Sequence, residues 1–222
     1  MPATRQSLNA RIRQNPQRTG EVLFSFAGIL IFAGFIHRPF PLILLAIGGL
    51  ALTALIIVIS TKDMTIPEVF GISRLDIRTL IFIPAAIILG LLLGGLARNR
   101  YDLGFLPPGL TLFALTAPLV GAGEELLFRG YIQGHMRPLG NFFSIVLATS
   151  MHTIYKLLVI LTLALPLQFD FLFLIFWTFT GGFLFGILKE LSGSSIPPVM
   201  AHAIFDVVVY GGLATAPVWV WS

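Results

Sequence analysis

Ionisable side chains with helical spacing occur inside strongly apolar segments of this sequence. They are Glu124, Glu125, Arg129, His152, Lys156, His202 and Asp206. A charge at the centre of a membrane helix costs ~2.5–3.5 kcal/mol, so such residues usually face a bundle interior or a water-filled cavity. Carboxylates and histidines are also the groups that transfer protons in hydrolysis. Their presence predicts a functional site.

The stretch GAGEELLFRG, residues 121–130, contains three of these charges within six positions. Glu125 and Arg129 are four residues apart with the glutamate first, which is the favoured order for an ion pair on a helix. Glu124 points about 100° away around the same helix, so it need not share the arginine. One carboxylate can therefore be neutralised structurally while the other remains free to act as a general base.

The composition indicates which elements must hold these residues. The chain is 56% hydrophobic and only 11% charged, with a mean hydropathy of +0.92, whereas soluble domains are about 25% charged. No cysteine is present, which excludes disulfides, thiolate metal sites and a cysteine nucleophile. We expect an all-α, polytopic transmembrane helical bundle with about seven spans. The expected spans are roughly 22–37, 40–60, 78–97, 109–134, 139–165, 169–189 and 196–219.

The chain is expected to be organised as a basic cytoplasmic segment (1–21), N-terminal transmembrane helices (22–108) and core helices carrying the ionisable residues (109–222). Lys and Arg favour cytoplasmic loops. For seven spans with the N-terminus inside, the cytoplasmic cations are Arg5, Arg11, Arg13, Arg18, Lys62, Arg74, Arg78, Arg137 and Lys189, and the external ones are Arg38, Arg98 and Arg100. This asymmetry predicts a cytoplasmic N-terminus, and the short chain suggests a bacterial inner membrane.

Three of the expected spans bring the ionisable residues to overlapping depths. If the fourth and fifth spans form an antiparallel hairpin, Glu124 lies about ten residues before the turn and His152 about twelve after it, at a rise of ~1.5 Å per residue. His202 and Asp206 are four residues apart on the last span and share one face. The two glutamates, two histidines and the aspartate are therefore expected to converge.

Three motifs resemble those of a known family. GEELLFRG resembles the EExxxR motif of the CPBP family, the CAAX-protease and bacteriocin-processing intramembrane proteases. SMHTIYK is similar to its second motif, a mid-helix histidine, and LSGSSIPPVMAHAIFDVV is similar to its third, HxxxN/D. The second motif is often FxxxH, and here Ala148 stands at the Phe position, which we interpret as a packing variation. The resemblance covers roughly 110–210.

The resemblance implies an intramembrane endopeptidase with a conical four-helix catalytic core. In such a protease Glu124 would activate the attacking water with help from His152, while Glu125 and Arg129 would hold the constellation in place. The substrate would be a peptide, or a prenylated or other membrane protein. Neither an organic cofactor nor a nucleic acid partner is implied.

His202 and Asp206 would, by the same resemblance, stabilise the oxyanion of the tetrahedral intermediate or hold a metal. Two histidines and one carboxylate make an acceptable catalytic zinc set, here His152, His202 and Glu124 or Glu125. The zincin motif HExxH is absent. We favour glutamate-dependent hydrolysis without a required cofactor and keep the zinc-dependent protease as an alternative.

Other interpretations keep the fold but change the function. A non-catalytic membrane protein that only binds, such as an immunity factor, would not need Glu124. Intramembrane carboxylates and histidines also build the proton relays of transporters, although no inverted repeat is evident. Lys156 is four residues after His152 and is interpreted as structural, with its long stem reaching toward the membrane surface. The aromatic run 169–179 is expected to face lipid.

Overall fold

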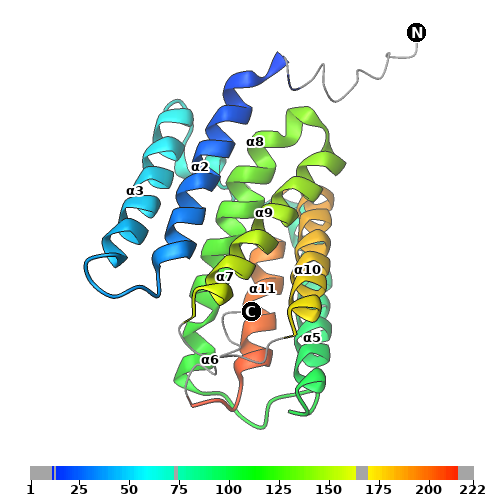
Figure 1. Cartoon of the computed structure of the whole chain (residues 1–222). Helices are drawn as coiled ribbons and strands as arrows, with labels where there is room; N and C mark the ends of the chain where they lie inside the picture. Colours follow the sequence, from blue (N-terminus) through cyan, green and yellow to red (C-terminus); the bar gives the residue numbers. More distant parts are fainter. Residues whose placement is uncertain (1–11, 13, 73–74, 164–169, 215–222) are drawn as a thin grey trace.

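The computed structural model describes residues 12, 14–72, 75–163 and 170–214, and this part of the chain contains helices and no β-strand (Figure 1). The principal helices are α2 (Pro16–Phe35), α3 (Ile43–Ser60), α5 (Ile77–Arg100), α9 (Asn141–Leu161), α10 (Phe171–Ser192) and α11 (Ile196–Tyr210). A short helix, α4 (Ile66–Val69), lies between α3 and α5. The expected all-α class is confirmed.

The expected number of seven membrane spans is not confirmed. Among the described residues, five helices, α2, α3, α5, α9 and α10, are long and apolar enough to cross a membrane, and α11 is a shorter apolar helix of 15 residues. The fourth expected span is divided into consecutive pieces. The pieces are α6 (Leu112–Thr116), α7 (Pro118–Glu125), the π-helix η1 (Leu126–Gln133), α8 (Gly134–Met136) and the 3-10 helix η2 (Arg137–Leu139).

Two of the cations that were assigned to one side of the membrane or the other, Arg98 and Lys189, are buried inside the bundle. Arg98 is 2% exposed, and its guanidinium donates to the carbonyls of Val208, Val209 and Gly211 at the end of α11. Lys189 is 8% exposed in α10, and its ammonium donates to backbone carbonyls of η1. Neither side chain marks a loop, and because one was assigned to each side, their removal leaves the charge asymmetry in the same direction. Four of the other assigned cations, Arg5, Arg11, Arg13 and Arg74, lie outside the described residues.

Glycines allow α5 to pack directly against α11, the helix that carries His202. A Cβ atom at Gly90 would overlap the carbonyl oxygen of Ala201, and one at Gly94 would lie 2.8 Å from Cβ of Val208. Small residues give this close backbone approach in membrane helices, where van der Waals packing replaces the hydrophobic effect. The α5–α11 contact therefore fixes the depth and rotation of His202.

Replacing Gly90 by valine is expected to destabilise the protein. The added side chain meets backbone atoms that cannot rotate away, so the free energy of unfolding should fall by about 1–3 kcal/mol. Gly48 on α3 has no atom within 4 Å of an added Cβ, which makes Gly48→Val a control with the same change in helix propensity. Thermal unfolding in detergent measures both. Equal melting temperatures for the two variants would contradict the packing argument.

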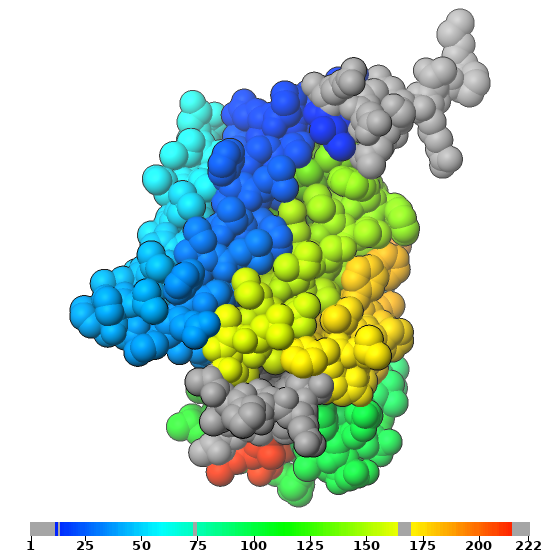
Figure 2. Space-filling model, viewed as in Figure 1, coloured from blue at the N-terminus to red at the C-terminus, as the bar shows by residue number. Residues whose placement is uncertain are grey.

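The hairpin of α2 and α3 forms one flank of the molecule, and α2 packs against α9 (Figures 1 and 2). The two helices touch at Gly28 and Gly49, where the Thr53 hydroxyl donates to the carbonyl of Ser25. Tyr131 of η1 places its hydroxyl 3.3 Å from Ser25 Oγ and 3.2 Å from Ser60 Oγ. This hydroxyl cluster joins the hairpin to the helix that carries the two glutamates.

Candidate active site

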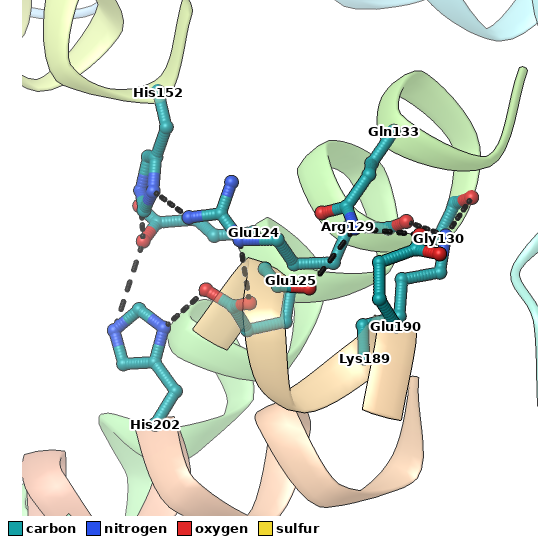
Figure 3. Close-up of polar contacts among 10 residues, drawn as sticks. Glu124, Glu125, Arg129, Gly130, Gln133, His152, Lys189, Glu190 and His202 are labelled. Atoms are coloured by element: carbon teal, nitrogen blue, oxygen red, sulfur yellow. Dashed lines mark hydrogen bonds and ion pairs between the residues drawn. The ribbon is translucent and has the colours of Figure 1, made fainter. Parts of the chain in front are cut away.

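Three helices bring Glu124, His152 and His202 together in the interior of the bundle (Figure 3). His152 Nε2 lies 3.3 Å from Glu124 Oε2, and His202 Nε2 lies 4.0 Å from the same oxygen. All three side chains are less than 10% exposed. The expected convergence of α7, α9 and α11 is therefore present in the structure.

Glu125 and Arg129 form the ion pair that their spacing predicts. Arg129 Nε lies 3.3 Å from Glu125 Oε2, and both side chains are 0% exposed. The pair spans the junction of α7 and η1, where the backbone changes from α to π geometry. Short π segments inside α-helices are frequent at functional sites. At this change of helix type, the adjacent carboxylates have different partners: Glu124 contacts His152, and Glu125 contacts His202.

The contact between Arg129 and His152 fixes the hydrogen on the imidazole. Arg129 Nη2 lies 3.2 Å from His152 Nδ1, and a guanidinium can only donate. Nδ1 is therefore the acceptor, and the ring hydrogen is on Nε2, where it can be donated to Glu124. Arg129 thus does more than neutralise Glu125, since it also orients the histidine that holds Glu124.

The second oxygen of Glu124 is bound by a residue that we interpreted as structural. Lys156 Nζ lies 2.8 Å from Glu124 Oε1, and the Lys156 side chain is 15% exposed. The ammonium therefore turns inward rather than toward the membrane surface. The i+4 spacing from His152 was the sequence signal for this position. His152 and Lys156 together hold both oxygens of one carboxylate from a single face of α9.

His202 lies between three carboxylates. Its Nδ1 is 3.0 Å from Glu125 Oε1, while Nε2 is 3.8 Å from Asp206 Oδ1. Nδ1 is engaged by Glu125, and Nε2 faces the space between Glu124 and Asp206. Asp206 shares a face with His202, as expected, but 3.8 Å is too long for a hydrogen bond.

A cavity of about 90 Å³ reaches Glu124 but not Glu125. Its lining includes Glu124, Lys156, His202 and Asp206. Glu125, by contrast, is enclosed by Arg129 and His202 and borders none of the cavities beside the site. Of the two adjacent carboxylates, Glu124 is thus the one that borders a space large enough for water molecules.

The geometry of the site also bears on the zinc alternative. Within the described residues, no group of three or more His, Asp or Glu side chains is identified as a metal cluster. Nε2 of His152 and Nε2 of His202 lie 3.3 and 4.0 Å from the same oxygen of Glu124. The zinc set of His152, His202 and Glu124 or Glu125 stays a prediction, as does hydrolysis without a required cofactor.

Lys189 is a second cation whose position the sequence did not indicate. Its ammonium lies against η1 and donates to the carbonyls of Arg129 and Gly130 (Figure 3). Gln133 at the end of η1 donates to the carbonyl of Gly186 at 3.0 Å and to Glu190 Oε1 at 3.0 Å. These contacts anchor the π-helix to α10.

The comparisons with known proteins agree with the three motifs. Residues 104–208 match the model of the type II CAAX prenyl endopeptidase Rce1-like family. No curated protein and no solved structure is significantly similar to the chain. The matched segment contains all six residues with expected catalytic roles. The similarity to the Rce1-like family of type II CAAX prenyl endopeptidases therefore covers the segment that carries the site, which is a little under half of the chain.

Proposed function

We propose that this protein is an intramembrane endopeptidase in which Glu124 activates water for attack on a peptide bond. The observation that carries the proposal is the environment of this carboxylate: it borders a cavity, while His152 and Lys156 hold its two oxygens. A fixed carboxylate inside a protein cavity is a suitable general base. The match of residues 104–208 to a protease family model supports peptide-bond hydrolysis as the reaction class.

In the proposed mechanism, Glu124 takes a proton from water as the water oxygen bonds to the scissile carbonyl carbon. The carbonyl electron pair moves to oxygen. His202 acts as the imidazolium, with Nδ1–H donating to Glu125 and Nε2–H, which faces the same cavity, donating a hydrogen bond to the oxyanion. When the carbonyl re-forms and the carbon–nitrogen bond breaks, Glu124 returns the proton to the leaving amine. Glu125 orients the His202 ring, and the nearby Asp206 carboxylate favours its positive charge.

The proposal is tested by incubating the purified, detergent-solubilised protein with a quenched-fluorescent peptide library that includes prenylated members. Products are identified by mass spectrometry, with and without a metal chelator. Chelator-resistant cleavage is expected. Cleavage that the chelator abolishes would replace the glutamate mechanism with a zinc-dependent one. If no peptide of the library is cleaved, the Glu124→Gln protein is used to capture binding partners from membranes. Each captured partner is then incubated with the wild-type protein. A partner that stays uncleaved would favour a non-catalytic binding protein.

Lys156→Met is expected to lower kcat by about 10- to 100-fold, because Glu124 loses the cation that contacts one of its oxygens. Lys156→Arg should recover a large part of the loss, since it retains the charge. Steady-state kinetics on one peptide gives kcat and KM for each variant, and circular dichroism checks the helix content. If Met and Arg at this position gave the same rate, Lys156 would be a structural residue, as first interpreted.

We propose that the N-terminus is cytoplasmic and that the protein lies in a bacterial inner membrane. The cavity beside Glu124 is lined by Phe113 of α6 and by Tyr210 at the end of α11, from the end of the bundle away from the N-terminus (Figure 1). The substrate would then reach Glu124 from the external half of the bilayer. The chain has no native cysteine, so a Lys62→Cys or Arg100→Cys variant carries a single thiol. An impermeant reagent added to spheroplasts should label only the Arg100→Cys variant; labelling of only the Lys62→Cys variant would reverse the orientation.

A further inference from the structure

A separate cavity lies at the N-terminal end of the bundle, between the start of α2, the end of α3 and the segments η1 and α8 (Figure 1). Its volume is about 700 Å³, which is in the range of about 300–1,000 Å³ that small-molecule sites occupy. It shares no described residue with the cavities beside Glu124. Its charged and histidine side chains, by which we define it as the α2 cavity, are Arg18, Glu21, Glu68, His135, Arg137 and Lys189.

The α2 cavity lies where the lipid-facing surface of the α2–α3 hairpin ends. Glu21 lines the cavity, whereas Leu23 and Phe24, which follow on α2, are exposed apolar side chains. On α3, Ser60 lines the cavity and the preceding Ile59 is exposed. Exposed apolar side chains on membrane helices contact the hydrocarbon core, and the polar residues beyond them lie in the head-group region. The cavity is therefore at the depth of the lipid head groups, at the end of the bundle that we propose to be cytoplasmic.

The two carboxylates of the α2 cavity already have partners. Glu21 Oε1 accepts a hydrogen bond from Gln17 Nε2 at 2.9 Å, and Glu21 Oε2 lies 2.8 Å from His135 Nε2. Glu68 Oε2 accepts from the backbone N–H and from the hydroxyl of Thr65, each at 2.8 Å, in the capping box of α4. Both carboxylates are therefore held by donors other than the arginine and lysine side chains that line the cavity.

The cations of the α2 cavity remain available to an anion. Among the described residues, neither Arg18 nor Lys189 forms an ion pair within 4.0 Å. A Cβ atom at Gly134, which also lines the cavity, would meet only Lys189 Nζ, at 3.2 Å, so glycine leaves the ammonium open to the cavity. Arg137 Nε lies 3.2 Å from Glu190 Oε2, but the Arg137 side chain is 56% exposed and stays accessible.

We propose that the α2 cavity binds a phosphate group, carried at this depth by an anionic phospholipid. Arginine binds phosphate through paired N–H groups and lysine binds it as a point charge, and Arg18, Arg137 and Lys189 supply both types of contact. Basic pockets between membrane helices on the cytoplasmic side bind anionic head groups. The acyl chains would follow the exposed apolar surface of α2. The inference goes beyond the proposed proteolytic function and does not depend on it, because none of these residues has a role in the reaction.

Native mass spectrometry of the purified protein with added phosphatidylglycerol or phosphatidylcholine tests the proposal. The wild type should bind phosphatidylglycerol at least about tenfold more tightly than the zwitterionic lipid. Arg18→Gln combined with Arg137→Gln should weaken phosphatidylglycerol binding by about 10- to 100-fold. Arg100→Gln is the matched control, because Arg100 also pairs with a carboxylate and is 57% exposed but does not line the cavity. Equal affinity for the two lipids, or unchanged affinity in the double variant, would overturn the proposal.

A steric variant tests the position of the site with every charge retained. Gly134→Leu fills the space next to the Lys189 ammonium and should weaken phosphatidylglycerol binding by about tenfold. Gly48→Leu is the control, since an added Cβ there has no atom within 4 Å, and thermal unfolding checks that both proteins are folded. Wild-type affinity in folded Gly134→Leu would overturn the site. Soluble glycerol phosphate identifies the source: if it displaces the lipid completely, the phosphate site stands and its ligand is a free phosphate ester.

Discussion

Glu124→Gln is expected to reduce kcat by at least about 10³-fold while leaving the protein folded, because an amide cannot accept the proton of the attacking water. Glutamine has nearly the same shape as glutamate, and its carbonyl oxygen can still accept from His152 Nε2. The loss should therefore appear in kcat, with KM changed little. Single-turnover kinetics on a cleaved library peptide, with thermal unfolding as the check on folding, gives the measurement.

The matched control is Glu21→Gln. Glu21 also forms a part-buried pair with a histidine, since its Oε2 lies 2.8 Å from His135 Nε2, but it lies near the start of α2, at the end of the bundle away from the cavities that border Glu124 (Figure 1). Its rate should stay within about threefold of wild type. If Glu124→Gln retained wild-type turnover while Glu125→Gln abolished it, the base would be Glu125, and the cavity argument would fail.

The site geometry followed from the sequence where helical spacing determines it. The four-residue separation of Glu125 and Arg129 gave the ion pair, and equal distances from one turn placed Glu124 and His152 at the same depth. Both inferences need only the rise and the rotation per residue of an α-helix. The ion pair forms although Arg129 lies in the π-helix η1, just beyond the end of α7, and His152 lies within the long α-helix α9.

Positions that depend on side-chain rotamers or on helix irregularity could not be obtained in this way. Lys156 and Lys189 have long stems that can extend to the surface or fold inward, and spacing does not distinguish the two. The π-helix η1 has no periodic signature in the sequence. It is anchored by tertiary contacts, in which Gln133 of η1 donates to a carbonyl of α10 and Lys189 of α10 donates to a carbonyl of η1. The division of the fourth expected span follows from this irregularity.

Removing the guanidinium of Arg129 should give the largest loss of stability in the molecule. Arg129→Met leaves the Glu125 carboxylate 0% exposed without its cation, and breaking a buried pair in this way costs about 3–5 kcal/mol. Arg100→Met is the control: Arg100 and Asp170 are 57% and 52% exposed, so its effect should stay below about 1 kcal/mol. Thermal or denaturant unfolding in the same detergent compares the two. A loss below about 1 kcal/mol for Arg129→Met would show that the pair is solvated or redundant.

A double variant separates the stabilising role of Arg129 from its role in the site. Arg129→Met with Glu125→Gln removes both charges, so most of the stability lost in the single variant should return. Activity should not return, because His152 Nδ1 still lacks the donor that fixes its ring hydrogen on Nε2, opposite Glu124. Recovery of stability without turnover is therefore the expected outcome. If turnover returned together with stability, Arg129 would act only through the fold, and the orientation of His152 would have to come from its stacking on Phe128.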